Sequence, residues 1–520
     1  VMSDAVDFEK DPERNRLSAR LGRTMKVGTN LSGAGLTFAA NAMFGGDKGD
    51  ERIAKALAAA LGKSKGPLMK VAQMVSTVPD FLPEEYADEL SKLQAQAPAM
   101  GWPFVKRRMR AELGADWQSK FAEFGKEAAH AASLGQVHRA TLHDGREVAC
   151  KLQYPDMSSA VESDVGQLKM MLGMFKRLDG SVDTSEIIEE VTDRLREELD
   201  YAREAKHLAL YQYLLKDADY VTVPDLVPEL STDRLLTMSW VTGDRLNDYE
   251  AAPQEVRNTI ARHLFWTWWK PFTGAAVIHG DPHLGNYQVT QEGGALNLLD
   301  FGCIRIFPPS FVAGVVDLYR GLLADDFDAV YAAFEKWGFK GLNTELVEVL
   351  SIWARFIYGP LIDDRVRSVA DGIKPGDYGR KEAFAVRRLL KEKGPVTVPA
   401  EFVFMDRAAI GLGAAYLRLG AELNYHRLFE ESLEGFSEAA LGEAQSQALG
   451  DLGQYRQRHR RFGPQLLCHR HQRALPRGDF RYRRPALPGR HLPCHSNRRR
   501  RYEHCRCAGL CRCRDAHPRK

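Results

Sequence analysis

Hydrophobic residues at helical spacing dominate residues 51–125 and predict a helical region. In the segment 67–79, apolar residues recur at i, i+3, i+4 and i+7, with a proline at each end. Lys70 and Gln73 share a different face of this predicted helix, three residues apart. Two further helices are expected at about 83–96 and 103–113.

Near residue 128 the pattern changes to the short apolar runs that are typical of strands. The small residues of 128–136 predict a flexible loop, and the turn sequence at 143–146 joins two strand-like runs into a hairpin. A long charged helix and two later strands follow. The expected bounds are 137–142 and 147–153 for the hairpin strands, about 185–215 for the helix, and 221–227 and 235–241 for the later strands.

The second half of the chain has a helical pattern from residue 253 to 450, interrupted by a hairpin that pairs 287–290 with 295–299. A small β-containing lobe followed by a larger helical lobe, with the crossing near 240–243, predicts an α+β fold. The expected parts are a flexible or membrane-proximal segment at 1–50, a helical extension at 51–127, an N-lobe at 128–241, a C-lobe at 242–455 and a tail at 456–520.

Charge divides the chain where the hydrophobic pattern ends. The 520 residues have a formal net charge of +3, and 44% hydrophobic with 27% charged residues is a globular composition. Residues 456–520 hold 20 of the 72 Lys and Arg residues but 3 of the 69 Asp and Glu residues, which leaves residues 1–455 with a net charge of −14. An acidic body argues against nucleic acid as its partner.

The basic tail also holds 6 of the 8 cysteines, and no hydrophobic period runs through it. One interpretation is a soft-metal site around CRCAGLCRC, or a nucleic-acid patch at Arg498–Arg501. We favour the other, a disordered tail or a reading frame shifted near Gln454, because the cysteine spacing matches no common zinc module and the boundary is abrupt.

The first residues are acidic and mixed, which predicts no secretory signal. The most apolar early stretch, Leu31–Phe44, is shorter than the ~20 residues that span a bilayer, so it is expected to lie against a membrane or to pack as a helix. Cys150 and Cys303 are the two cysteines outside the tail, which predicts a reducing, cytoplasmic compartment.

The strongest chemical signal is the sequence HGDPHLGN at 279–286, followed by LLDFG at 298–302. Phosphoryl transfer from a nucleotide needs a carboxylate that orients the attacking hydroxyl, and oxygen ligands that hold Mg²⁺ on the phosphates. Asp281, Asn286 and Asp300 are of these types, and the predicted hairpin between them folds the two loops together.

A lysine on the second strand of the first hairpin is the next candidate. Lys151 can pair with the phosphates of a nucleotide, and it needs a carboxylate to hold it. Asp200 and Glu204, four residues apart on the predicted charged helix, are the candidates for that partner. His279 and His283 are expected to have structural roles, because no third imidazole lies near them to complete a metal site.

Loop, strand lysine, helix carboxylate, catalytic loop and DFG follow one another in the order of the protein-kinase parts. Over roughly residues 50–440 the chain resembles the UbiB/AarF family of atypical protein-kinase-like ATPases, which includes ubiquinone-biosynthesis proteins. AAHAASLGQVH at 128–138 is similar to the family's alanine-rich loop, KVAQ at 70–73 to its KxGQ helix, and ELD at 198–200 to its ExD motif.

The resemblance implies a two-lobed protein-kinase-like fold and a role for each matching position. Asp281 would position a hydroxyl or water, while Lys151 paired with Glu204 would fix the phosphates. Asn286 and Asp300 would hold Mg²⁺. The implied nucleotide-binding set is Ala131, Ala132, Ser133, Gly135, Gln136 and Lys151, and the residues implied to cover the pocket are Lys70, Gln73, Glu198 and Asp200.

Three positions depart from the family pattern. Ala72 replaces the KxGQ glycine, Leu284 replaces the second proline of HGDPHPGN, and His130 stands where a small residue is usual. The first two changes remove no ligand, and His130 is expected to alter nucleotide access. None of the three removes a catalytic group.

These features predict an ATP- and Mg²⁺-dependent atypical kinase or ATPase, which the resemblance connects to ubiquinone or isoprenoid-lipid metabolism. Two alternatives stay open: a small-molecule phosphotransferase of the aminoglycoside or choline kinase type, and a nucleotide-sensing scaffold without turnover. The expected partners are nucleotide, isoprenoid lipid or ubiquinone-biosynthesis proteins and the surface of the inner membrane, with no nucleic acid. The oligomeric state, including a homodimer, is left open.

Overall fold

The structure is a computed structural model that describes residues 100–458, apart from 133, 164, 167–191, 193–194, 282, 291–293, 371, 374–377 and 394–398. The predictions for Lys70, Gln73 and Ser133 therefore lie outside the described residues. The same holds for the apolar stretch Leu31–Phe44 and for the basic tail from residue 459 onward.

Five strands form the first sheet, in the order β1–β3–β4–β6 with β2 paired to β3, and all pairings are antiparallel. The predicted hairpin of β3 and β4 is confirmed, and its turn holds Gly145 at a φ of +86°, which glycine adopts without strain. The strands are β1 Glu123–Phe124, β2 His130–Ala132, β3 Gly135–Thr141, β4 Glu147–Gln153 and β6 Leu235–Ser239. β4 lies between two neighbours, and six of its seven residues are buried.

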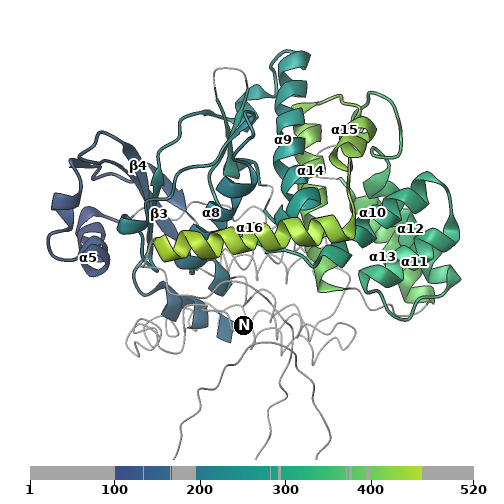
Figure 1. The fold of residues 1–520 in the computed structure, drawn as a ribbon, viewed down its shortest axis with the longest axis horizontal. Coiled ribbons are helices and arrows are strands. Elements are labelled where there is room, and N and C mark those ends of the chain that lie inside the picture. The colour runs from purple at the N-terminus through teal and green to yellow at the C-terminus, as the bar shows by residue number, and fades with distance from the viewer. Residues whose placement is uncertain are drawn as a thin grey trace, which may run out of the picture. The chain divides into compact units, whose positions relative to one another are not determined.

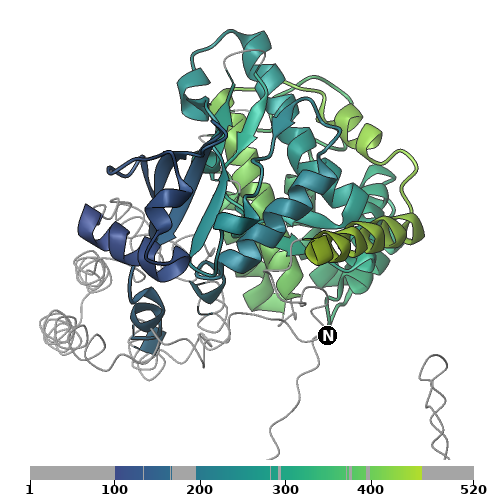
Figure 2. The ribbon, with the colours of Figure 1, turned by 60° about the vertical axis from the view of Figure 1, so that its left-hand side comes forward.

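One face of this sheet is covered by α5 (Trp102–Leu113) and the short helix η1 (Trp117–Lys120), shown beside the sheet in Figures 1 and 2. Val105 and Met109 of α5 pack with Trp117 against apolar residues of β3 and β4 in one buried cluster. The helix that the sequence predicted at 103–113 is therefore confirmed. Arg108 of α5 extends the contact, since its guanidinium donates to the main-chain oxygens of Gln153 and Tyr154.

The single long helix predicted over 185–215 is wrong, because the chain leaves the helix before Tyr201. α8 spans Tyr201–Leu214, and Asp200 is its N-cap, with a side chain that accepts a hydrogen bond from Arg203 N (2.9 Å). An N-cap residue has non-helical dihedral angles, so Asp200 separates α8 from the residues before it while satisfying one free N–H group.

Two smaller sheets belong to the second half of the structure. The order in one is β5–β10–β9–β7, with β5 parallel to β10, and the other pairs β8 with β11. The bounds are β5 Val221–Thr222, β7 Asp244–Arg245, β8 Val277–His279, β9 Tyr287–Val289, β10 Leu296–Leu298 and β11 Ile304–Ile306. The chain enters the second sheet at β5, returns to the first sheet at β6, and passes to the second sheet again between Ser239 and Asp244.

Helices fill the remainder of the described chain, as the sequence predicted. They are α9 Gln254–Ala275, α10 Pro309–Leu323, α11 Phe327–Trp337, α12 Thr344–Tyr358, α13 Arg380–Lys393, α14 Ala400–Leu419, α15 Tyr425–Ser432 and α16 Glu438–Arg458, with short 3-10 helices η2 Pro228–Leu230, η3 Leu246–Tyr249 and η4 Leu284–Asn286. α16 packs against α8, α9 and α10 (Figure 1) and ends three residues beyond the expected boundary at 455. No helix within residues 100–458, where described, is both long and apolar enough to cross a bilayer.

Candidate active site

Lys151 lies between two carboxylates from distant parts of the chain. Its Nζ is 2.6 Å from Glu204 Oε1 and 3.3 Å from Asp300 Oδ2. β4 supplies the lysine and α8 the glutamate, while Asp300 follows β10 as the first residue of DFG. The predicted pairing of Lys151 with Glu204 is confirmed, and three sequence motifs meet at one ammonium group.

Burial and neighbouring charges shift the pKa values of Lys151 and Glu204. Burial lowers the pKa of Lys151, but the carboxylates of Asp300 and Glu204 raise it further, so it stays well above its ordinary value. Burial raises the pKa of Glu204 to about 7 and Asp300 adds to the rise, while Lys151 opposes it. The face of Tyr201 lies 5.2 Å from Lys151 Nζ and favours the cation. Lys151 is therefore charged, and its charge opposes the rise that burial causes in the pKa of Glu204.

His279 binds the main chain of both proposed catalytic aspartates, Asp281 and Asp300. Its Nε2 donates to Asp300 O (2.7 Å), and its Nδ1 accepts from Asp281 N (3.4 Å), which requires the neutral tautomer with the proton on Nε2. Trp268 Nε1 in turn donates to His279 O (3.2 Å). The structural role expected for His279 is confirmed. Likewise, the side chain of His283 accepts from Gly285 N (3.1 Å) and caps η4.

The residues present fit a magnesium ion that shares its coordination with a nucleotide. Asn286 Nδ2 donates to Asp281 O (3.0 Å), which leaves Asn286 Oδ1 as the acceptor of that amide. Leu299 N donates to Asn286 O (3.0 Å), so Asn286 lies beside the residue that precedes Asp300. Mg²⁺ prefers oxygen ligands and takes few of them from protein. Asn286 Oδ1 and the Asp300 carboxylate are oxygen groups of this kind.

The alanine-rich segment is a tight hairpin, and its prediction as a flexible loop is wrong. β2 pairs with β3 so that Ala131 lies opposite Gln136 and Ala132 opposite Gly135. A Cβ on Gly135 would come within 2.3 Å of Leu152 O, so the glycine allows β3 to lie close to β4. Strand pairing thus orders a segment whose small residues have little strand propensity of their own.

Gln136 binds the main chain just before α5. Its Oε1 accepts from Met100 N (2.7 Å), and its Nε2 donates to Met100 O (3.2 Å) and lies 2.8 Å from His138 Nε2. His138 Nδ1 donates to Gly125 O (2.8 Å), and burial lowers the pKa of this histidine, which keeps it neutral. The predicted nucleotide contact of Gln136 stays a prediction, since its amide already has these partners.

The structure places the remaining predicted residues in different surroundings. His130 is exposed and its ring stacks on Trp240, with centroids 6.0 Å apart and an interplanar angle of 17°. Glu198 is half-buried, and Asp200 is buried as the α8 cap. The pocket-covering roles of Glu198 and Asp200 stay predictions, because the helix implied to meet them lies outside the described residues.

Two functional contacts were missed by sequence reasoning. His207 Nδ1 donates to Phe301 O (3.1 Å), and so connects α8 to the phenylalanine of DFG. Glu197 pairs with Arg305 of β11 (2.6 Å) and with Arg203 of α8 (2.8 Å). Neither contact has a local signal, since a histidine and a glutamate on charged segments are ordinary surface residues until the chain folds.

Comparison with known proteins identifies a kinase-like domain over the residues that form this site. The family described as "ABC1 atypical kinase-like domain" matches residues 92–334. Over these residues the chain is similar to the UbiB/AarF family. It is similar to the Saccharomyces cerevisiae protein "Atypical kinase COQ8, mitochondrial", with 27% identity over 80% of this chain and 85% of that protein. It is also similar to "AarF domain-containing protein kinase 1" of Xenopus tropicalis, with 31% identity over 62% of this chain and 61% of that protein.

A solved structure supports the same conclusion about the fold. Rv3197 from Mycobacterium tuberculosis, solved in complex with erythromycin, has a TM-score of 0.52 and 26% identity over 71% of this chain and 93% of that one. The two-lobed kinase-like α+β fold predicted from the sequence is confirmed.

Proposed function

We propose that this protein is an ATP- and Mg²⁺-dependent atypical kinase or ATPase of the UbiB/AarF type. The position of Lys151 Nζ between Glu204 and Asp300 carries the proposal. The Glu204 side chain is 3% exposed and that of Asp300 is 40% exposed, so Glu204 is the fixed partner and Asp300 faces solvent. Phosphate oxygens can therefore take the place of Asp300 beside Lys151 while Asp300 turns to a metal ion.

The chain's own residues supply positioning and charge. Lys151 would bind phosphate oxygens, and Asn286 Oδ1 with the Asp300 carboxylate would hold Mg²⁺, which neutralises charge on the phosphates when bound. Asp281 would orient the attacking hydroxyl or water. Its main chain is fixed on both sides, by His279 at its N–H and by Asn286 at its carbonyl, which holds its carboxylate in place for that task.

Site variants in a Mg²⁺-dependent ATP hydrolysis assay test this proposal. Asp281→Ala and Asp300→Asn should each lower kcat by roughly 10²-fold or more, because preorganised charge supplies most of the catalysis of phosphoryl transfer. Asp317→Asn is the matched control, since Asp317 is a partly exposed aspartate on α10 that pairs with Lys336 of α11 (2.8 Å). Undiminished turnover in Asp281→Ala would show that the site is wrongly assigned.

We also propose that the phosphate chemistry supports ubiquinone or related isoprenoid-lipid metabolism, with an isoprenoid lipid or a ubiquinone-biosynthesis protein as partner. Similarity to the UbiB/AarF family, and to the protein named COQ8, supports this part of the proposal. Complementation of a ubiquinone-deficient bacterial strain that lacks its own UbiB-type protein tests it, with Asp300→Asn as control. Labelled phosphate transfer from ATP to an aminoglycoside or to choline would instead favour a small-molecule phosphotransferase.

A further inference from the structure

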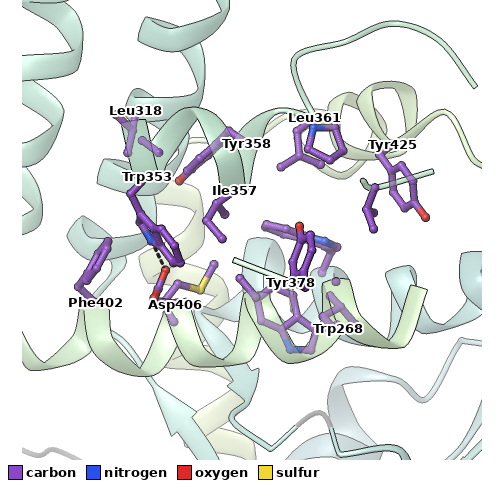
Figure 3. Close-up of a pocket in the computed structure, with 18 of the residues that line it drawn as sticks. Trp268, Leu318, Trp353, Ile357, Tyr358, Leu361, Tyr378, Phe402, Asp406 and Tyr425 are labelled. Atoms are coloured by element: carbon purple, nitrogen blue, oxygen red, sulfur yellow. Dashed lines mark hydrogen bonds between the residues drawn. The ribbon is translucent and has the colours of Figure 1, made fainter. Parts of the chain in front are cut away.

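The helices of the second half enclose a cavity that none of the kinase motifs lines. Its volume is about 90 Å³, and it lies among α9, α12, α14 and their neighbours (Figure 3). Roughly 10–15 Å³ of such space holds one water molecule, so this cavity has room for several waters or for a small organic molecule.

The walls of the cavity are aromatic and aliphatic, and Asp406 is the carboxyl group among the described residues that line it. Figure 3 shows its labelled aromatic and acidic side chains gathered around the space. They are Trp268 from α9, Trp353 and Tyr358 from α12, Tyr378 from the segment before α13, Phe402 and Asp406 from α14, and Tyr425 from α15. Apolar pockets with one well-placed polar group are the usual form of small-molecule sites.

Asp406 is a carboxylate without a cationic partner in this apolar setting. Trp353 Nε1 donates a hydrogen bond to Asp406 Oδ1, and no lysine, arginine or histidine side chain that the structure describes forms an ion pair with it. Burial raises the pKa of Asp406 to about 7, against the opposing effect of the Trp353 hydrogen bond. An unpaired charge in apolar surroundings is costly, so a bound cation would remove that cost.

We propose that this cavity binds a small organic cation, an alkylammonium or hydrophobic amine, which pairs with Asp406 and lies against the aromatic rings. Aromatic faces attract ammonium groups, most strongly where water is excluded. A neutral ligand of the same size would fill the space but leave the carboxylate unpaired, and an anion would be repelled by it. The aromatic walls and the lone carboxylate therefore select for positive charge.

The other ionisable groups around Asp406 stay constant near neutral pH. Burial raises the pKa of Tyr358 and of Tyr378 above the ordinary phenol value, and the Tyr358 hydroxyl donates to Val315 O (3.1 Å). Glu382 and Arg367 act on Tyr378 in opposite directions. Between pH 6 and 8, Asp406 is thus the group whose charge changes among the described residues that line the cavity. Cation binding should strengthen as pH rises, because the carboxylate is the form that binds.

Calorimetric titration of the full chain with tetramethylammonium tests the proposal. The ionised fraction of Asp406 rises from about a tenth at pH 6 to about nine tenths at pH 8, so the apparent Kd should fall roughly tenfold. Tert-butanol is the neutral control of similar size and should bind more weakly, with no pH dependence. Tetramethylammonium has no hydroxyl to phosphorylate, and Asp300→Asn should bind it normally, which separates this site from ATP turnover.

Two variants decide whether the cavity is the site. Asp406→Asn keeps an oxygen for Trp353 but removes the charge, and it should weaken tetramethylammonium binding at pH 8 at least tenfold and abolish the pH dependence. Ala409→Leu, on the cavity wall, should block both probes while thermal unfolding shows the protein still folded. The proposal is overturned by no binding at millimolar tetramethylammonium, by equal binding of tert-butanol, or by unchanged binding in Asp406→Asn.

Discussion

His207 is a buried base that connects α8 to the DFG segment. The pKa of His207 is lowered to about 3, mainly by burial and also by the positive charge of Arg203. The hydrogen bond to Phe301 opposes this shift. The unfolded chain binds a proton at this histidine near pH 6.5, whereas the folded chain does not. Its contribution to stability is therefore present above pH 6.5 and is lost as pH falls from about 6.5 towards 3.

His207→Asn should reduce the loss of stability in acid. Asparagine keeps a donor near the position of Nδ1 for Phe301 O but has no proton to gain, so a contribution on the order of 4 kcal/mol should disappear from the pH dependence. Glu204 affects the pH dependence of stability in the opposite direction. Because its pKa is raised in the folded protein, it lowers stability as pH rises from about 4.5 to 7. Urea unfolding of the variant at pH 7.5, 6, 5 and 4 should thus give a free energy of unfolding that no longer falls, or that rises, as pH is lowered. The same fall as in the unsubstituted protein would contradict the low pKa of His207.

The residues that the proposed chemistry needs could be predicted, whereas buried groups with shifted pKa values elsewhere could not. Lys151, Glu204 and Asp300 lie in motifs whose order along the chain indicates that they meet, and the distances agree. The low pKa of His207 and the raised pKa of Asp406 depend on burial by helices distant in sequence. Burial of a single polar residue has no local pattern, so only the folded structure reveals it.

At the scale of elements, the close pairing of β3 with β4 sets the position of Lys151. Gly135 lies where the two strands approach most closely, with Leu152 O and the Tyr201 hydroxyl 2.3 and 2.7 Å from the place of an added Cβ. Leu152 directly follows Lys151 on β4, and Tyr201 contacts the Lys151 ammonium group. A methyl group at this position must therefore displace either the strand or the ring that holds the lysine.

Gly135→Ala should destabilise the protein by about 1–3 kcal/mol and raise KM for ATP more than it lowers kcat, because it shifts the phosphate-binding lysine. Gly274→Ala is the matched control, since nothing lies within 4 Å of its Cβ position in α9. Chemical denaturation and ATP titration measure both effects. A Gly135→Ala protein with normal KM would show that the strands have room to adjust.

Element types were predicted better than their ends. The β3–β4 hairpin follows from its alternation and turn residues, and the helices of the second half follow from their spacing. The break at Asp200 was missed because the charged pattern runs on through it, although aspartate is a preferred N-cap residue. The alanine-rich hairpin was missed because pairing with β3, a tertiary contact, outweighs its weak propensity.

At the scale of the whole molecule, α16 packs against helices that are distant from one another in the sequence. It packs against α8, which carries Glu204, and against α9 and α10. Gln445 of α16 donates from Nε2 to Ala275 O (3.0 Å) and to Phe307 O (2.8 Å). Ala275 ends the helix before β8, and Phe307 follows β11, so one side chain joins both strands of the two-stranded sheet at the end opposite His279.

Removal of the Gln445 amide should therefore weaken the catalytic loop from a distance. Gln445→Ala leaves two carbonyl groups without a donor, which costs about 1–3 kcal/mol. Gln445→Glu should cost more than alanine, because a carboxylate of nearly the same shape would face two carbonyl oxygens. Gln447→Ala, two residues along the same helix and exposed, should be neutral. Thermal unfolding should therefore show Gln447→Ala as the most stable variant, Gln445→Ala as less stable and Gln445→Glu as the least stable. A Gln445→Glu protein as stable as Gln445→Ala would show that Gln445 does not act as a donor.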